Sequence, residues 1–171
     1  DQVEFFEKPE PIFDSFGIEV EIERALERKV WLKSGGYIII DQVEALTVVD
    51  VNSGRFVGKS SLEDTITQIN LEALNEVAYQ IRLRNLGGIV IVDFIDMALA
   101  ANREKVLAAL EHALSRDRAK TSIVRMSEIG LVEMTRKRVR ESLGKTLTVG
   151  CPHCNGKGFI KSELTIANDI L

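Results

Sequence analysis

Apolar positions recur along this chain with two different periods. They follow helical spacing over residues 18–26, 61–84 and 102–115, so these three segments are predicted to be helices. Ser61 is a favoured N-cap residue at the start of the longest segment, and Asp64 occupies the position that a capping box would use. Three amphipathic helices need a shared apolar surface to pack against.

Short apolar runs predict the strands that supply this surface. Residues 30–32 and 37–40 flank a Gly35-Gly36 turn and read as a hairpin. Further strands are predicted over residues 45–51, 89–94, 121–125 and 131–134. The strand over 89–94 is apolar on both faces and is expected at the centre of a sheet. The alternation of strands and helices predicts a layered α/β domain over residues 26–147.

The two ends of the chain differ from this body. Residues 1–17 are expected to be an irregular connector, and residues 144–158 a glycine-containing linker. No apolar run is long enough to span a bilayer, and the N-terminus lacks the features of a secretory signal. The sequence begins with Asp1 rather than methionine, which suggests a fragment or a processed product.

Composition and charge refine the expected class. The chain has 171 residues, of which 45% are hydrophobic and 28% charged, as in soluble globular domains. Its net charge is −4, but residues 1–115 carry 11 basic and 20 acidic side chains. Residues 116–145 carry 9 basic and 4 acidic side chains, which is either a polyanion-binding footprint or a solvated face.

Carboxylates follow two of the predicted interior strands. Asp50 and Asp93 each end such a strand, and Asn52 points to the same side of its strand as Asp50. If the strands are neighbours, the two carboxylates converge and suit Mg²⁺, with Asp96 as a spare ligand or an N-cap. The alternative is that these aspartates cap loops or pair with basic residues of the following loop, Arg55 and Lys59.

The two cysteines form one Cys-x-x-Cys motif. Cys151 and Cys154 are followed by glycines, as in knuckles that wrap two thiolates around zinc. His153 is expected to point away, and His112 to lie on a helix surface. Because no other cysteine is present, four thiolates would require a second copy of the chain. A redox dithiol is the alternative, and either chemistry suits a reducing, cytoplasmic compartment.

Several sequence blocks together resemble the ribonuclease E/G family, and the likeness covers almost the whole chain. These blocks are Ala45 to Gly58, Asn70-Leu71-Glu72-Ala73, Arg82 to Gly88, Val92-Asp93-Phe94-Ile95-Asp96-Met97 and Cys151-Pro152-His153-Cys154. The resemblance implies an endoribonuclease that cuts single-stranded RNA and leaves a 5′-phosphate on the downstream product.

The resemblance also assigns roles and boundaries. Asp50 and Asp93 match the family's Mg²⁺-binding aspartates, Asn52 matches the asparagine that supports them, and Cys151 with Cys154 matches a zinc link shared by two protomers. The implied fold is a DNase I-like subdomain over residues 26–147, followed by the zinc link over 148–162. Residues 1–25 resemble the end of an RNase H-like subdomain, and residues 163–171 the start of a small dimerisation domain. Lys120 lies near a basic residue that helps the family recognise a 5′-monophosphate.

The resemblance further implies binding partners, and two other functions stay open as alternatives. It implies a zinc-linked homodimer, a tetramer in the full-length protein, and RNA-decay partner proteins. Arg55 and Lys59 are expected to hold the RNA backbone, and further phosphate contacts are expected from Arg136, Lys137, Arg138 and Arg140. The rival interpretations are a non-catalytic zinc module, since the cysteine motif also resembles one repeat of DnaJ-type chaperones, and a structural scaffold.

Overall fold

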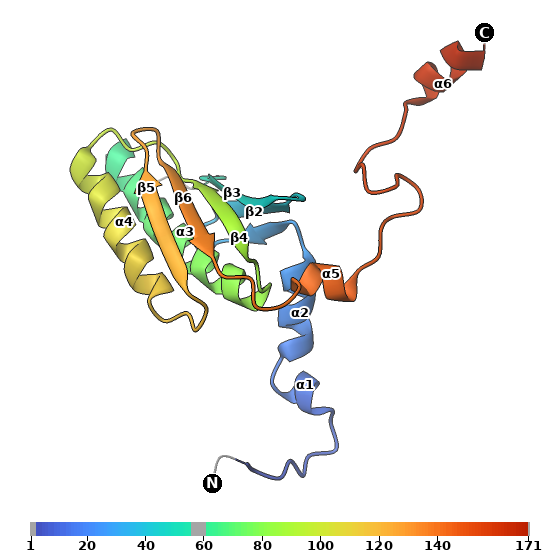
Figure 1. Ribbon diagram of the computed structural model, residues 1–171, viewed down its shortest axis with the longest axis horizontal. Helices are drawn as coiled ribbons and strands as arrows, with labels where there is room; N and C mark the ends of the chain where they lie inside the picture. The colour runs from blue at the N-terminus through green and yellow to red at the C-terminus, as the bar shows by residue number, and fades with distance from the viewer. Residues whose placement is uncertain (1–2, 56–60, 171) are drawn as a thin grey trace.

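A computed structural model describes residues 3–55 and 61–170 of the chain (Figure 1). Within these ranges six strands form one mixed sheet. The strands are β1 (Lys29–Trp31), β2 (Tyr37–Gln42), β3 (Leu46–Asn52), β4 (Gly88–Asp93), β5 (Thr121–Met126) and β6 (Leu131–Arg136). The helices are α1 (Ile12–Ser15), α2 (Ile18–Leu26), α3 (Leu62–Leu83), α4 (Ala100–Leu114), α5 (Leu143–Leu147) and α6 (Glu163–Ile170).

The sheet has the strand order β1-β2-β3-β4-β6-β5. Neighbouring strands are antiparallel except β3 and β4, which run parallel. A parallel pair needs a long crossover, and α3 provides it between these two strands. The C-terminal ends of β3 and β4 therefore lie side by side at one end of the sheet.

The two faces of the sheet have different environments. Helices α3 and α4 pack against each other and against one face, where alternate strand residues such as Val49, Val92 and Val132 are fully buried (Figure 1). The opposite face carries the other alternating set, and its members are half-buried or exposed. We call this second surface the open face. It includes Ile89, which remains 46% exposed.

Helix α3 lies behind the sheet, and its sequence shows both why it begins at this point and which of its sides is buried. Ser61 caps it, because its hydroxyl oxygen accepts a hydrogen bond from the backbone N–H of Asp64 at 3.2 Å. The helix has 22 residues, and its apolar stripe includes the buried Ile69, Leu74 and Val77. Burial of such a stripe against a sheet is the dominant stabilising term for a helix of this kind.

The segments at both ends project from this body. Helices α1 and α2 lead into β1, and α5 contacts α2 before the chain extends away toward α6 (Figure 1). No helix among the described residues combines the length and hydrophobicity that crossing a bilayer requires.

Most expected elements are confirmed. The helix over 18–26, the hairpin, the Ser61 cap and the central position of β4 agree with the structure. Two details were wrong, because residues 12–15 form a short helix within the expected irregular connector, and residues 143–147 form α5 where the linker was expected to begin. The mixed α/β architecture is confirmed, while the DNase I-like assignment and the domain boundaries stay predictions.

Candidate functional site

Asp50 and Asp93 are cross-strand partners. The parallel register of β3 and β4 pairs them directly, with Asp50 two residues before the end of β3 and Asp93 at the last residue of β4. Neighbouring strands lie about 4.8 Å apart, and paired residues of parallel strands point to the same face. The alternation of buried residues puts both side chains on the open face. The predicted convergence of the two carboxylates at one sheet end is therefore confirmed.

Asn52 supports Asp50 from the same strand. It lies two residues further along β3, so its side chain emerges on the same face. Its side-chain amide donates a hydrogen bond to Oδ2 of Asp50 at 2.8 Å. This bond fixes the orientation of one carboxylate and leaves its other oxygen available.

The electrostatics of the pair favour a cation. Burial raises the pKa of Asp93, and the negative charges of Asp50 and Asp96 raise it further. Among the described residues, neither Asp50 nor Asp93 forms an ion pair with a basic side chain. The alternative of pairing with Arg55 is therefore not what the structure has. A divalent cation between the two carboxylates would offset their repulsion.

The donor set fits Mg²⁺ better than a transition metal. Carboxylate oxygens are hard ligands, and Mg²⁺ is often held by one or two carboxylates while it keeps several waters. Within the described residues no group of three or more His, Cys, Asp or Glu side chains is arranged to enclose a metal.

Helix α3 holds the segment that follows Asp93. The side-chain amide of Asn70 donates to the carbonyl of Ile95 at 2.8 Å, and its oxygen accepts from the Ile95 N–H at 3.1 Å. In the first turn of α3, Glu63 accepts hydrogen bonds from the N–H groups of Ala98 and Leu99. Leu99 is the N-cap residue of α4, so the N-cap expectation for Asp96 was wrong, and Glu63 holds the backbone just before the helix.

The sequence alone did not predict these roles. Asn70 stood out only as part of a block that resembles the family, and Glu63 did not stand out at all. The available signal was a polar residue inside the apolar stripe of the longest helix, since Asn70 lies between Ile69 and Ala73 on the buried side. A buried asparagine must find hydrogen-bond partners, so its presence there predicts an irregular backbone segment nearby.

The basic residues expected to bind RNA divide between the two ends of the sheet. Arg55 is exposed, three residues after the end of β3 and close to the acidic pair in sequence, while Lys59 lies outside the described residues. Lys120, Arg138 and Arg140 are exposed at the opposite end. Because β6 pairs Leu131 with Asp93 and Arg136 with Gly88, that end lies roughly 17 Å along the strands from the acidic pair.

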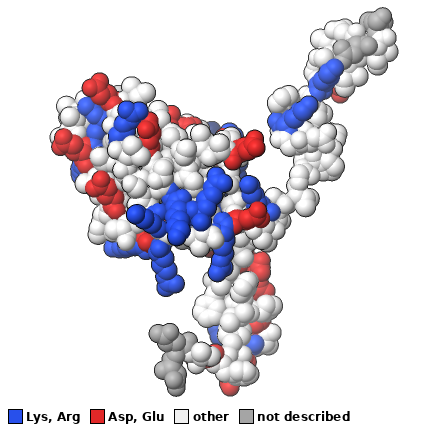
Figure 2. All heavy atoms as spheres, viewed as in Figure 1, with Lys and Arg blue, Asp and Glu red and all other residues white. Residues whose placement is uncertain are grey.

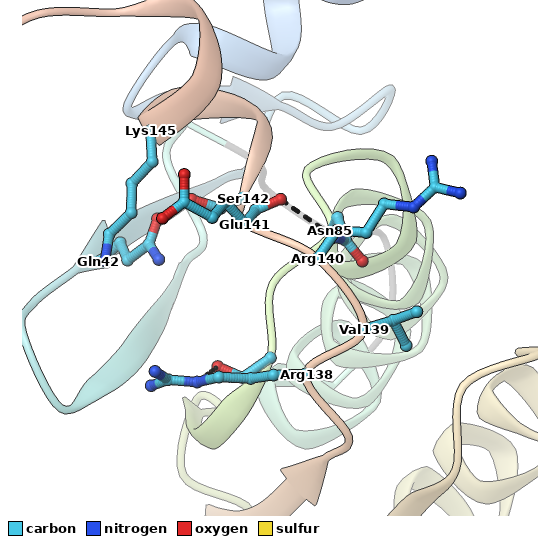
Figure 3. Close-up of a pocket in the computed structure, with 9 residues that line it drawn as sticks. Gln42, Asn85, Arg138, Val139, Arg140, Glu141, Ser142 and Lys145 are labelled. Carbon is cyan, nitrogen blue, oxygen red and sulfur yellow. Dashed lines mark hydrogen bonds between the residues drawn. The ribbon is translucent and has the colours of Figure 1, made fainter.

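A patch of basic side chains lies near this end of the sheet. Figure 2 shows Lys and Arg side chains gathered on the lower part of the visible face, between the end of β6 and α5 in Figure 1. A cavity of about 240 Å³ lies within it, lined among others by Arg138, Glu141 and Lys145. Figure 3 shows the Arg138 side chain reaching below Gln42 and that of Arg140 pointing to the other side. The Nε of Arg138 donates to the Gly87 carbonyl.

Arg136 does not belong to this exposed set, although its sequence position suggested a phosphate contact. Its side chain is 6% exposed and pairs with Asp117, whose side chain is 4% exposed, at 2.7 Å. It also donates to the Leu86 carbonyl at 2.8 Å. Burial alone would raise the pKa of Asp117, but the hydrogen bonds from Arg136 and Ala119 lower it. Arg136 is a buried structural cation.

The cysteine motif lies on the extended segment between α5 and α6. Cys151 is exposed, Cys154 is partly buried, and both are free thiols. The Gly158 N–H donates to the Cys154 sulfur at 3.4 Å, and positive φ angles at Asn155, Gly156 and Gly158 form the turn. Hydrogen bonds from the backbone N–H groups of Cys154 and His153 lower the pKa of Cys151. Thiolate character of this kind favours metal ligation.

Comparisons with known proteins agree on one family. Residues 1–139 match the model of the ribonuclease E/G family. The chain is 55% identical to ribonuclease G of Escherichia coli over 170 residues, covering 99% of this chain and 35% of that protein. It is 48% identical to ribonuclease G of Haemophilus influenzae over 171 residues, which are 35% of that protein. Against ribonuclease E of Haemophilus influenzae it is 41% identical over 170 residues, or 18% of that protein. The chain thus spans about a third or less of these relatives.

Proposed function

The chain belongs to the ribonuclease E/G family, and on that premise we propose that it carries the metal-binding centre of an endoribonuclease. The observation that carries the proposal is the direct register pairing of Asp50 with Asp93 on the open face. Two carboxylates at adjacent strand ends, neither of which forms an ion pair with a basic side chain among the described residues, are arranged for a divalent cation.

In this proposal Asp50 and Asp93 hold Mg²⁺, and Asn52 orients Asp50 through its 2.8 Å hydrogen bond. When bound, Mg²⁺ supplies a Lewis acid that activates water and neutralises charge on the phosphate. The reaction adds the water oxygen to phosphorus and breaks the bond from phosphorus to the 3′ oxygen. The downstream product keeps a 5′-phosphate. Asn70 and Glu63 keep the Asp93 strand end in place from α3.

The proposed substrate is single-stranded RNA. The RNA can lie along the open face, starting at the acidic pair, where Arg55 and Lys59 would contact its sugar-phosphate backbone. Lys120, Arg138 and Arg140 would contact RNA phosphates about 17 Å away along the β-strands. Such contacts position the strand and raise affinity without reading its sequence.

We also propose that Cys151 and Cys154 ligate one Zn²⁺ together with the same residues of a second copy. The support is the free, exposed motif with its N–H to sulfur bond and lowered Cys151 pKa. Four thiolates complete a tetrahedral structural site. A zinc-linked dimer, tetramer formation in the full-length protein and association with other RNA-decay proteins are parts of this proposal, as is a cytoplasmic setting.

The second candidate is a zinc-bridged dimerisation or scaffold module without catalytic activity. The cysteine motif favours it, because the motif lies on the extended segment between α5 and α6, away from the sheet (Figure 1). The acidic pair separates the two candidates, since a scaffold has no use for two adjacent carboxylates that form no ion pair with a basic side chain in the described part of the chain.

The test is RNA cleavage by Asp50→Asn and Asp93→Asn variants, which keep side-chain size and remove one negative charge each. A 5′-monophosphorylated single-stranded RNA is incubated with Mg²⁺, and the new termini are mapped. We expect each variant to lose at least about 100-fold in rate, in line with the loss of a preorganised charge-stabilising group. Asp64→Asn, at an exposed position near the start of α3, is the matched control. Unchanged Mg²⁺-dependent cleavage by both strand-end variants would refute the proposal.

A further inference from the structure

Three side chains form a cationic aromatic cluster at the β1 edge of the open face. The Trp31 and Tyr37 rings meet edge to face, with centroids 5.3 Å apart. The Lys29 ammonium lies 3.8 Å from the Trp31 ring centroid and 3.7 Å from that of Tyr37. Trp31 nevertheless remains 59% exposed. We call Lys29, Trp31 and Tyr37 the aromatic cluster.

The register places this cluster next to the acidic pair. Tyr37 is the cross-strand partner of Asn52, and Trp31 is the partner of Tyr37. Asn52, Tyr37 and Trp31 therefore form a row of paired residues across β3, β2 and β1. The neighbouring row on the same face contains Asp50 and Asp93. With strands about 4.8 Å apart, Trp31 lies roughly 10 Å from the Asp50 strand.

The cluster is held in a fixed position relative to the acidic pair. A Cβ at Gly36 would lie 2.9 Å from the Asn52 carbonyl, and one at Gly54 would lie 2.3 Å from the Gly35 carbonyl. The hairpin turn therefore packs directly against the segment after β3. The backbone N–H of Ser34 also bonds to Glu72 of α3 at 3.1 Å. Trp31 and the carboxylates thus belong to one rigid surface.

The exposed Trp31 ring, with a half-buried Tyr37 ring and a cation beside it, suits one ligand of this substrate class. Single-stranded nucleic acids are bound by stacking bases on aromatic side chains and by pairing phosphates with nearby cations. We infer that the aromatic cluster is a stacking site for a nucleobase of single-stranded RNA that lies within one or two nucleotides of the phosphate at the acidic pair. The inference rests on the proposed function and adds a second contact to the same substrate path.

The sequence offers a direct probe, because Trp31 is the single tryptophan of the chain. Its emission is followed while a single-stranded RNA oligonucleotide is added in EDTA, so that no cleavage occurs. Stacking of a base on the indole is expected to quench the emission. An oligonucleotide with the same backbone but abasic nucleotides is expected to bind through its phosphates without the quench.

Variants then measure the contribution of the cluster. Loss of one stacked base costs about 5- to 150-fold in RNA affinity, so we expect Trp31→Ala to raise the Kd within that range and Trp31→Phe to restore most of it. Phe16→Ala is the matched control, because Phe16 is 69% exposed, contacts the ring of Phe6 and lies in the projecting N-terminal segment. Its Kd is expected to equal that of the unchanged protein.

The outcomes separate this inference from the proposed function. Equal quenching by the abasic oligonucleotide, or an unchanged Kd in Trp31→Ala, would overturn the stacking site even if Asp93→Asn abolishes cleavage. A change in oligomeric size or stability in Trp31→Ala without a change in RNA affinity would instead assign the cluster to protein contacts. Base-dependent quenching with full cleavage by Asp93→Asn would uphold the stacking site and overturn the metal centre.

Discussion

Asn70 and Ile95 are joined by two hydrogen bonds, in which the side-chain amide of Asn70 bonds to both the carbonyl and the N–H of Ile95. Asn70 is fully buried in α3, and Ile95 lies two residues after Asp93. The strand end that carries the carboxylate is therefore tied to the helix that connects β3 to β4. Loss of this bond would release the segment and leave two backbone groups without partners.

We expect Asn70→Ala to lower the free energy of unfolding by about 1–3 kcal/mol, because buried polar groups lose their bonds. We also expect a 10- to 100-fold weaker response to Mg²⁺, as is typical when a group that orients a metal ligand is removed. Chemical denaturation and the Mg²⁺ dependence of cleavage measure the two effects.

Asn75→Ala is the control for this substitution, since Asn75 is an exposed asparagine on the same helix whose side chain donates to the Leu71 carbonyl within that helix. It should leave the Mg²⁺ dependence unchanged. An Asn70→Ala protein that is less stable but keeps its normal Mg²⁺ response would show that Asn70 supports the fold without positioning the site.

The raised pKa of Asp93 predicts how stability depends on pH without metal. Burial and the charges of Asp50 and Asp96 disfavour its ionised form in the folded state. The folded state therefore binds its proton more tightly than the unfolded state does. Its contribution to stability is present below the ordinary carboxyl pKa near 3.8 and is lost as the pH rises through the folded pKa.

Asp93→Asn should abolish the loss of stability that ionisation of Asp93 causes. The metal-free variant should therefore melt at a higher temperature than the unchanged protein at neutral pH. Thermal melts in EDTA across the acid range would measure it. Addition of Mg²⁺ should stabilise the unchanged protein and not the variant, by mass action on the folded state. A variant that melts lower at every pH would contradict the sign of the effect.

Two arginines near the end of β6 should behave in opposite ways. Arg136→Gln breaks a buried ion pair with Asp117 and should cost about 3–5 kcal/mol of stability. Arg138→Gln changes an exposed side chain and should leave stability within about 0.5 kcal/mol. It should instead weaken RNA binding and reduce the salt dependence by about 0.7 in the slope of log K against log salt. Denaturation and binding at several salt concentrations distinguish these roles.

The fold was largely predictable because its signals are local. Residues 18–26 and 61–84 show the helical period, Ser61 marks a helix start, and the hairpin has its Gly-Gly turn. Apolar strands that end in aspartate were enough to suggest that Asp50 and Asp93 meet. That expectation needed β3 and β4 to be neighbours, which only the tertiary arrangement decides.

Other parts of the site could not be predicted in this way. Arg136 stands in a run of basic residues, so the sequence alone suggests an exposed side chain. In the sheet it lies on the buried side of β6 and pairs with Asp117, 19 residues earlier. Asn70 and Glu63 bond to backbone groups 25 or more residues away, and such contacts leave no periodic pattern. The aromatic cluster likewise depends on the register between β1 and β2.

The zinc proposal predicts a change in size. Replacing both Cys151 and Cys154 by serine removes two thiolates per chain, so a complex that shares one ion should dissociate toward smaller species. Sedimentation with and without a chelator would measure this, with a zinc assay expected to give one ion per two chains. Replacement of the exposed His153 by alanine should leave size and zinc content unchanged. Zinc bound at one ion per chain, or no change in size, would count against the shared site.

The pairing of Asp50 with Asp93 is most directly tested by counting bound metal. Mn²⁺ can replace Mg²⁺ as a paramagnetic probe, and titration of the chain in the absence of RNA reports binding without relying on cleavage. The account predicts one Mn²⁺ site outside the cysteine motif, lost in Asp50→Asn and equally in Asp93→Asn. A Mn²⁺ site that persists in either variant with unchanged affinity would contradict it.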